Sequence, residues 1–578
     1  MEKTKYVVGD IPLANHPHPQ KKRDSVLILN GKWDFAVAKQ NEKVEKFDKS
    51  ILVPFSPESD NSGIGNGFSL GKDEKLVYER TFDLGEDMLL GITELWFGAV
   101  DQKCEVFVNG EKVGSHNGGF TPFTIDITSQ AKKGENIIRV ECVDITTSSH
   151  GARGKQAEKR GGIWYTPQSG IWQPVWVESR KTDSIADFSV TTSSKDKSVT
   201  IKTDYDKTIT LTIFDKGNKI VEKEFEKEIT INYDFELWSP ENPALYDFSL
   251  TTKGGDKVSS YFGVRSFSVG KDKTGKKRLL LNDKPYFFNG ILDQGYWSDG
   301  LLTYPSDEAV VDELNMLKDM GFNTVRKHIK LEPFRWYYYC DKIGLTVWQD
   351  FVNGGGEYDF NHIALMPFLG FKHKDNDYKY FARENEKGRK EYMQMTDEIL
   401  HYLKNFTCIS LWTPFNEGWG QFDSYEVTKY ILQKDDTRLI DSASGWHDQG
   451  KDKTTMLSMH TYYTPLVAPK DSRPVVLSEF GGYSMKISGH VFDEDKEFGY
   501  KKFKTKEKLQ QALEKLYLKK LKPLVKKGLC AAIYTQVSDV EEEINGLITY
   551  DRRIQKVDTS FMKNILDEVT NEINKVEM

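Results

Sequence analysis

Apolar and polar side chains alternate in short runs along the first 180 residues. Residues 75–84 (KLVYERTFDL) and 104–116 (CEVFVNGEKVGSH) show this two-residue period, which is typical of strands with one buried face. Asn109 and Gly110 lie inside the second run, where a tight hairpin turn is favoured. Residues 1–180 are therefore predicted to form a jelly-roll β-sandwich.

Residues 181–270 contain a second set of evenly spaced strand patterns. Runs at 198–205, 208–215 and 246–253 alternate apolar and polar residues, and no cysteine occurs between them. This pattern predicts a small immunoglobulin-like β-sandwich of the kind that has no disulfide.

From residue 271 onward the apolar period changes to that of a helix. In residues 305–321, Val310, Leu314 and Leu317 lie on one helical face, and Ser306 is suited to the N-cap. Similar helical segments alternate with short apolar runs to the end of the chain. Alternating helices and apolar strands predict a parallel sheet that is covered by helices.

Eight apolar runs in this region are interpreted as strands, and together they predict a (β/α)8 TIM barrel over residues 271–578. The runs are residues 286–292, 322–329, 345–351, 408–417, 438–444, 456–463, 474–480 and 530–539. The third run is followed by an insertion at 352–388, which is too long for a simple connection and is expected to build part of a site.

Polar or aromatic side chains follow every one of these runs. In an eightfold barrel the carboxyl ends of the strands surround the active site, so these residues should converge. They are Asp293, Arg326, His328, Asp350, Asn416, Glu417, Ser444, Trp446, His460, Tyr462, Glu479 and Gln536.

Two of these residues, Glu417 and Glu479, share one context, because each follows an apolar strand and has glycine nearby, Gly418 in one case and Gly481 in the other. A single glutamate after a strand is more often a turn or capping residue. Two carboxylates facing each other across a barrel mouth instead provide what acetal cleavage requires, a proton donor and a nucleophile or base. Trp297, Trp419 and Trp446 could cover the apolar face of a sugar, or could be rim packing.

Net charge and the absence of known motifs argue against several other classes of protein. The net charge of −7 gives no basic footprint for nucleic acid or for an anionic membrane. No HExxH motif, Walker motif, zinc-type Cys/His spacing or EF-hand pattern is present, so neither a metal nor another cofactor is expected. A homo-oligomer is possible, although no stretch of the sequence identifies an interface.

The first residues, MEKTKYVVGD, lack the apolar segment of a secretory signal, and no apolar run approaches the roughly 18 residues of a membrane span. The five cysteines are scattered and include no CxxC pair. Reduced thiols in a cytoplasmic protein are the simplest expectation.

The chain resembles glycoside hydrolase family 2, the group of β-galactosidases, β-glucuronidases and β-mannosidases, over nearly its full length. The stretches that carry the resemblance are SGIWQPVWVE (169–178), LWSPENPALY (237–246), FGVRSF (262–267), GFNTVRKHIKLEP (321–333), NEGWG (416–420) and SEFGG (478–482).

The resemblance implies a retaining, exo-acting β-glycosidase in which Glu417 is the acid/base and Glu479 the nucleophile. Asn416 would hold the sugar 2-hydroxyl, and Arg326 would keep the nucleophile ionised. The acid/base is expected to have a raised pKa. The carbohydrate would also be bound by Asp293, His328, Asp350, Trp419, Trp446, His460, Tyr462 and Gln536.

His460 or Tyr462 is expected to orient Glu479. β-Galactosides are the first expectation for the substrate, with mannosides or arabinosides as alternatives. Glucuronides are disfavoured, because Leu547 stands where the glucuronidase Asn-x-Lys motif, beginning here at Asn545, has lysine. A transglycosylase and a catalytically silent carbohydrate-binding protein also remain open.

Overall fold

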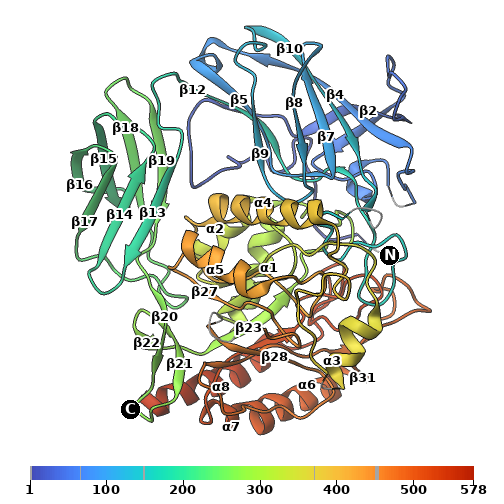
Figure 1. Ribbon diagram of the computed structural model, residues 1–578, viewed down its shortest axis with the longest axis vertical. Coiled ribbons are helices and arrows are strands. Elements are labelled where there is room, and N and C mark those ends of the chain that lie inside the picture. The colour runs from blue at the N-terminus through green and yellow to red at the C-terminus, as the bar shows by residue number, and fades with distance from the viewer. Residues whose placement is uncertain (1–2, 66, 147–149, 370, 450–454, 578) are drawn as a thin grey trace.

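The computed structural model describes residues 3–577 except 66, 147–149, 370 and 450–454. Figure 1 shows an N-terminal sandwich in blue and cyan at the top and a second sandwich in green at the left. The C-terminal half, coloured from yellow-green to red, lies below them with its strands surrounded by helices.

The N-terminal part is a jelly-roll β-sandwich of two antiparallel sheets. One sheet has the order β1 (Val26–Ile28), β12 (Val175–Lys181), β5 (Gly91–Phe97) and β9 (Phe123–Asp126). The other has the order β3 (Lys49–Val53), β2 (Gly31–Lys39), β4 (Glu74–Leu84), β10 (Gly134–Val143), β7 (Lys103–Val108) and β8 (Glu111–Asn117). The short strands β6 (Val100–Asp101) and β11 (Gly170–Ile171) pair beside them, and two 3-10 turns occupy Asp60–Ser62 and Glu86–Met88.

The second part is the immunoglobulin-like sandwich. Its sheets have the orders β13 (Phe188–Ser193), β14 (Ser198–Thr203), β17 (Glu228–Asn232) and β16 (Asn218–Phe225), β15 (Ile209–Asp215), β18 (Tyr246–Thr252), β19 (Lys257–Phe262). Their inner faces form a separate apolar core, which agrees with the alternating pattern in the sequence. A small sheet of β20 (Phe267–Lys271), β21 (Lys277–Leu281) and β22 (Lys284–Pro285) leads into the third part.

The C-terminal part is the predicted TIM barrel. Within the described residues, eight strands form one curled parallel sheet. Its order is β27 (Leu439–Ile440), β26 (Ile409–Thr413), β25 (Thr346–Asp350), β24 (Thr324–Lys327), β23 (Phe288–Asp293), β32 (Leu529–Thr535), β29 (Val475–Gly481) and β28 (Leu457–Thr461). The first and last strands meet where the Thr455 N–H donates to Ile440 O at 3.0 Å.

The helices begin and end at the signals in the sequence. In α1 (Asp307–Asp319), the Ser306 hydroxyl accepts a hydrogen bond from the Ala309 N–H at 3.2 Å. Helix α2 (Phe334–Ile343) ends at Gly344, whose φ of +83° favours glycine. The other helical segments are α3 (Met366–Phe368), α4 (Glu386–Leu403), α5 (Ser424–Lys434), α6 (Lys506–Glu514), α7 (Lys522–Val525), α8 (Thr559–Glu577) and the π-helical turns Asn361–Leu365 and Lys515–Leu521.

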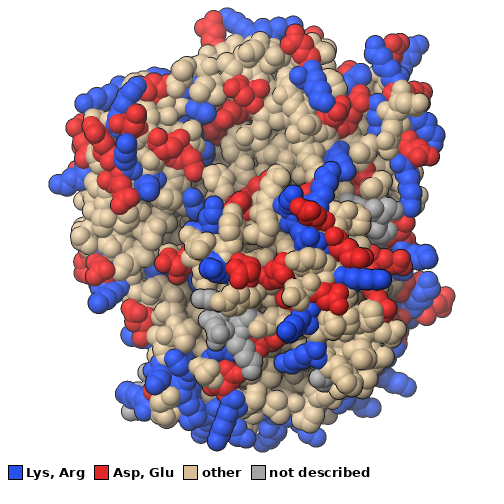
Figure 2. All heavy atoms as spheres, in the orientation of Figure 1, with Lys and Arg blue, Asp and Glu red and all other residues tan. Residues whose placement is uncertain are grey.

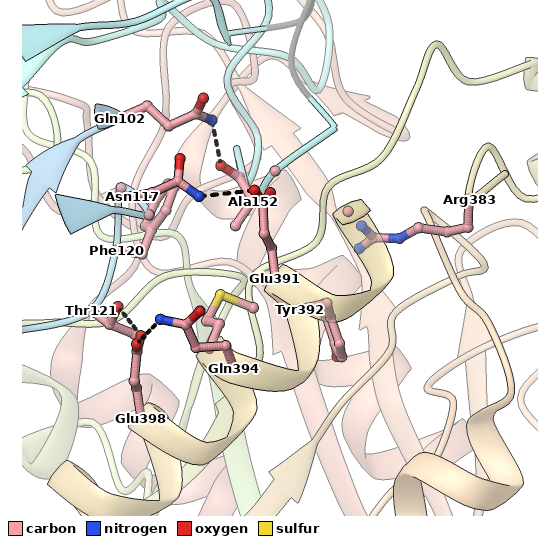
Figure 3. Close-up of a pocket in the computed structure, with 15 residues that line it drawn as sticks. Gln102, Asn117, Phe120, Thr121, Ala152, Arg383, Glu391, Tyr392, Gln394 and Glu398 are labelled. Atoms are coloured by element: carbon pink, nitrogen blue, oxygen red, sulfur yellow. Dashed lines mark hydrogen bonds between the residues drawn. The ribbon is translucent and has the colours of Figure 1, made fainter. Parts of the chain in front are cut away.

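Helix α4 packs against the N-terminal sandwich. Asn117 donates to Glu391 and Thr121 donates to Glu398, and both contacts appear as dashed lines in Figure 3. The cavity at this interface has a volume of about 30 Å³, which is enough for about one water molecule and too small for a sugar.

On the face shown in Figure 2, basic and acidic side chains are interspersed. In the part of the chain that the structure describes, no helix is long and apolar enough to cross a membrane.

Candidate active site

Glu417 is held by the turn that follows β26. Its backbone has a φ of +51° and its N–H donates to Ser444 O at 2.8 Å. At the next residue, Gly418, φ is +80° and a Cβ atom would lie 2.5 Å from the His447 ring. This close approach explains the glycine, and the turn directs the carboxylate into the barrel mouth.

Glu479 lies in β29 and is bonded on both of its carboxylate oxygens. Arg326 Nη1 donates to Oε1 at 3.0 Å, and the Tyr462 hydroxyl donates to Oε2. Arg326 also donates to both oxygens of Asp350 at 3.0 Å and to Asn416 Oδ1 at 2.8 Å. The Arg326 guanidinium therefore holds both Glu479 and Asn416, the residue before Glu417, in position.

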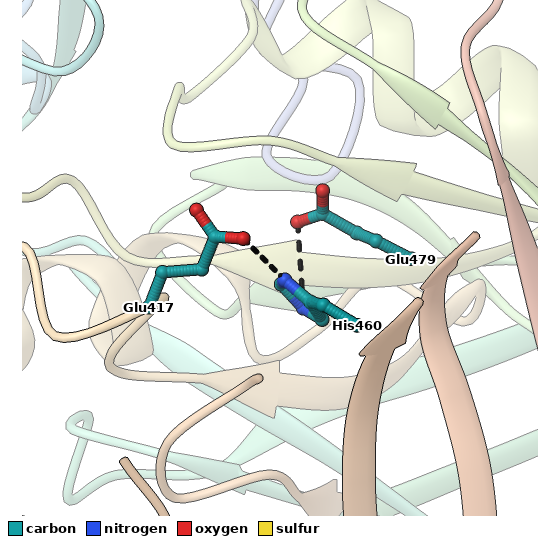
Figure 4. Close-up of side chains that lie close together, drawn as sticks. All are labelled: Glu417, His460 and Glu479. Carbon is teal, nitrogen blue, oxygen red and sulfur yellow. Dashed lines mark hydrogen bonds and ion pairs between the residues drawn. The ribbon is translucent and has the colours of Figure 1, made fainter. Parts of the chain in front are cut away.

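His460 lies between the two glutamates, as Figure 4 shows. Its Nδ1 is 2.6 Å from Glu417 Oε1, and its Nε2 is 3.5 Å from Glu479 Oε1 and 2.9 Å from the Ser444 hydroxyl. Of the two orienting residues expected for Glu479, Tyr462 makes the direct bond, whereas the shorter contact of His460 is to Glu417.

Electrostatics lower the pKa of both glutamates. Burial raises the pKa of Glu417, but the charge and hydrogen bond of His460 outweigh it and bring the pKa to about 2. Burial also opposes ionisation of Glu479, but His460 and Arg326 together hold its pKa below the ordinary value. The expectation of a raised pKa for Glu417 is therefore wrong for this state, because the charge and hydrogen bond of His460 favour the carboxylate over its protonated form.

Several other predicted residues lie around the pair. His328 Nδ1 is 2.7 Å from Asp350 Oδ2, so both residues support Arg326. Trp419 donates its indole N–H to Glu417 Oε2 at 3.2 Å. The half-buried Trp446 ring lies edge-on to His460, with the ring centres 6.1 Å apart.

Gln536 follows β32, and its side chain is hydrogen-bonded to Asn545 rather than to Glu417 or Glu479. Its amide donates to Asn545 Oδ1 at 2.7 Å, and Asn545 in turn donates to Glu543 Oε1 at 2.9 Å. It belongs to the wall that follows the eighth strand.

Asp293 does not reach the site. It pairs in register with Lys327, and the Lys327 ammonium donates to its carboxylate at 2.5 Å and to Glu332 at 2.8 Å. Because side chains alternate along a strand, Lys327 points away from the side on which Arg326 and His328 lie. A role for Asp293 in binding the sugar is therefore not supported.

Sequence reasoning missed a contribution from the N-terminal sandwich. Trp164 packs edge-on against Trp419 with ring centres 5.2 Å apart, and it stacks on Tyr358 from the insertion after β25. Tyr165 donates to Glu543, which lies just after β32. Trp164 and Tyr165 come from the loop between β10 and β11. The glycines and basic residues of this loop were the signal available in the sequence.

One oxygen of Glu417, one nitrogen of His460 and one oxygen of Glu479 all lie within 4.8 Å of each other. These atoms could hold a metal ion, but the hydrogen bonds of His460 already account for their proximity.

Known proteins with similar sequences and structures are glycosidases. The chain matches the description "Glycosyl hydrolases family 2, TIM barrel domain" over residues 273–569. Residues 26–175 match the sugar-binding domain of the same family, and residues 171–265 match its central model.

A β-galactosidase of Thermoanaerobacter pseudethanolicus is 26% identical over 71% of this chain, which spans 54% of that protein. A β-glucuronidase of Streptococcus agalactiae is 23% identical over 75% of each chain. The solved structure of a β-D-glucuronidase from Dictyoglomus thermophilum has a TM-score of 0.74 and 19% identity, with 95% of this chain and 98% of that one covered. The family matches extend across all three parts of the fold, and the chain belongs to glycosyl hydrolase family 2.

Proposed function

We propose that this protein hydrolyses terminal β-glycosides with retention of configuration, with Glu479 as nucleophile and Glu417 as acid/base. The observation that carries the proposal is the separation of the two carboxylates, which have oxygens within 4.8 Å of each other. Retaining glycosidases hold their carboxyl groups about 5–5.5 Å apart, whereas inverting enzymes need about 6.5–9.5 Å to admit a water molecule.

In the first step, Glu479 attacks the anomeric carbon while the departing oxygen takes a proton from Glu417. Arg326 and Tyr462 orient Glu479 by donating hydrogen bonds to its two carboxylate oxygens. Burial raises the pKa of Glu417 and His460 lowers it to about 2, so the protonation of Glu417 in this step depends on its hydrogen bond with His460.

In the second step, Glu417 is ionised and accepts a proton from a water molecule, which displaces the sugar from Glu479. Asn416, whose Oδ1 accepts a hydrogen bond from Arg326, would bind the 2-hydroxyl next to the reacting carbon. A transglycosylase would use the same residues and would differ only in the acceptor for this step.

The sugar is of the galactoside or glucuronide type. The curated relatives include both β-galactosidases and β-glucuronidases, and the similar solved structures are β-glucuronidases. The sequence resemblance favours a β-galactoside, and this expectation remains part of the proposal.

The test is hydrolysis of 4-nitrophenyl β-glycosides by the wild type, by Glu479→Ala and by the matched control Glu357→Ala, an exposed carboxylate in the insertion after β25. Glu479→Ala should lose turnover by a factor of about 10⁴ or more, and Glu357→Ala should retain it. Added azide should restore turnover of the alanine variant as the α-glycosyl azide. Full activity of Glu479→Ala would overturn the assignment, and absence of turnover on every glycoside would favour a silent binding protein.

A further inference from the structure

The carboxylates that face the barrel mouth already have hydrogen-bond donors on both of their oxygens. This holds for Glu417 and Glu479, as described above, and for Asp350, which accepts from Arg326 and His328. Glu543 accepts from the Tyr165 hydroxyl on Oε2 and from the Asn545 amide on Oε1. Each oxygen of these four carboxylates therefore already has a hydrogen-bond partner.

One further cation nevertheless lies at this mouth. Lys155 belongs to the loop between β10 and β11, and the residue is only 7% exposed. The N–H groups of Arg153 and Gly154 donate to Asn353 O at 2.9 and 3.1 Å. A Cβ atom on Gly154 would lie 3.0 Å from Ile329 O, so the loop is wedged between the segments that follow β24 and β25.

The Lys155 ammonium lies beside an aromatic pair, one member of which contacts Glu417. Its nitrogen lies 5.5 Å from the centre of the Trp164 ring, and Trp164 contacts Trp419, which donates to Glu417. The charge of Lys155 lowers the pKa of Glu417, Glu543 and His328, as expected for a cation directed into the space that these three residues border.

Over the described part of the chain, no hydrogen bond or ion pair joins the Lys155 ammonium to another residue, and the residue is largely buried. A largely buried charge normally has a partner of opposite sign, because desolvation is costly. Glu417 and Glu543 are near enough for the charge of Lys155 to lower their pKa, but within the described residues neither carboxylate contacts the ammonium.

We propose that Lys155 binds an anionic substituent of the substrate, a carboxylate or a sulfate ester on the sugar that occupies the site. The inference rests on the proposed glycosidase function and narrows its substrate to acidic β-glycosides. An anionic group would give the ammonium a direct ionic contact, whereas a neutral sugar would leave it with hydroxyl contacts only.

The experiment compares wild type, Lys155→Met, Lys155→Arg and the control Lys159→Met, an exposed lysine of the same loop. The substrates are the 4-nitrophenyl β-D-glucuronide, β-D-galactoside and 6-sulfo-β-D-galactoside, which separate a carboxylate, a neutral sugar and a sulfate ester. Wild type should prefer one acidic substrate. Lys155→Met should reduce kcat/KM for it about 10- to 100-fold, mainly through KM, and should change the neutral substrate less than about threefold.

Lys155→Arg keeps the charge and should recover much of the lost activity, and Lys159→Met should match wild type. A wild-type preference for the neutral galactoside, or an equal loss on neutral and acidic substrates in Lys155→Met, would overturn the inference and leave the glycosidase proposal intact. If no substrate is cleaved, calorimetric binding of D-glucuronate, galactose 6-sulfate and D-galactose decides. Binding of an acidic sugar that weakens in Lys155→Met supports the role of Lys155 even then, and no preference for an acidic sugar refutes it.

Discussion

His460 is the residue whose surroundings most affect the proposed chemistry. It contacts both glutamates and the Ser444 hydroxyl, and it is fully shielded from solvent at its side chain. A glutamate with a pKa of about 2 is almost entirely ionised at neutral pH, so in the proposed mechanism His460, its hydrogen-bond partner, shares in supplying the proton for the leaving group.

This sharing predicts a dependence on the leaving group for His460→Asn. The variant should lose about 10²-fold in kcat on alkyl β-glycosides, whose leaving groups need a proton, because general acid catalysis contributes about 10²–10⁴-fold. On 2,4-dinitrophenyl glycosides, whose leaving group needs no proton, the loss should stay within about threefold. Steady-state kinetics on the two substrate types measures the difference. An equal loss on both would show that His460 only supports the fold.

Arg326 gives a prediction about pH. Its charge is one of the causes that hold the pKa of Glu479 below the ordinary value. The nucleophile must be ionised, so activity is present above this pKa and is lost as the pH falls through it. In Arg326→Gln the charge is removed and the pKa of Glu479 rises, which should move the acidic limb of kcat/KM up by about one pH unit or more.

Arg326→Lys keeps a positive charge and serves as the matched control, with an acidic limb close to that of the wild type. Circular dichroism at each pH separates loss of ionisation from unfolding, since Asp350 loses its main partner in Arg326→Gln. An acidic limb that stays in place in Arg326→Gln would contradict the assigned cause of the low pKa.

At the scale of elements, the loop between β10 and β11 connects the N-terminal sandwich to the barrel mouth. Gly154 has a φ of +62° and lies against Ile329 O, so Gly154→Ala should strain the loop and displace Lys155. We expect a loss of about 1–3 kcal/mol in stability and a rise in KM. Gly217→Ala is the control, because Gly217 has a φ of +83° in a hairpin of the central sandwich and nothing lies within 4 Å of its added Cβ.

Thermal unfolding and steady-state kinetics of both variants distinguish strain from function. Gly217→Ala should lose stability without a change in KM. Equal KM values for Gly154→Ala and wild type would show that the loop does not position a substrate-binding group.

The elements also show what the sequence could and could not predict. The barrel strands and the polar residues at their ends could be predicted from the sequence, because an apolar run between two helical patterns is a local signal. The direction of Asp293 depends on its register with Lys327, which only the folded sheet sets. Lys155 lies more than 250 residues before Glu417 in the chain, and a loop that folds onto another domain leaves no periodic signal in the sequence.

At the scale of the whole molecule, the central sandwich contacts the barrel around Asp341 and Thr407, among other places in the described residues. The Trp238 indole N–H donates to Asp341 O at 2.9 Å, and the Tyr261 hydroxyl donates to the Asp341 carboxylate at 2.7 Å. Gly263 N–H donates to the Thr407 hydroxyl at 2.9 Å, just before β26. Trp238 is fully buried and belongs to the same apolar cluster as the barrel core, so the two parts should unfold together.

Replacing the indole tests this coupling. Trp238→Ala should cost about 3–5 kcal/mol, and because the cavity opens between two parts, calorimetric unfolding should separate into two transitions. Phe248→Ala is the matched control, since Phe248 is equally buried but belongs to the core of the central sandwich alone. It should lower the unfolding temperature and keep a single transition. If Trp238→Ala also unfolds in one transition, the coupling does not depend on this side chain, and the remaining contacts, among them those at Asp341 and Thr407, suffice to couple the sandwich to the barrel that carries the two glutamates.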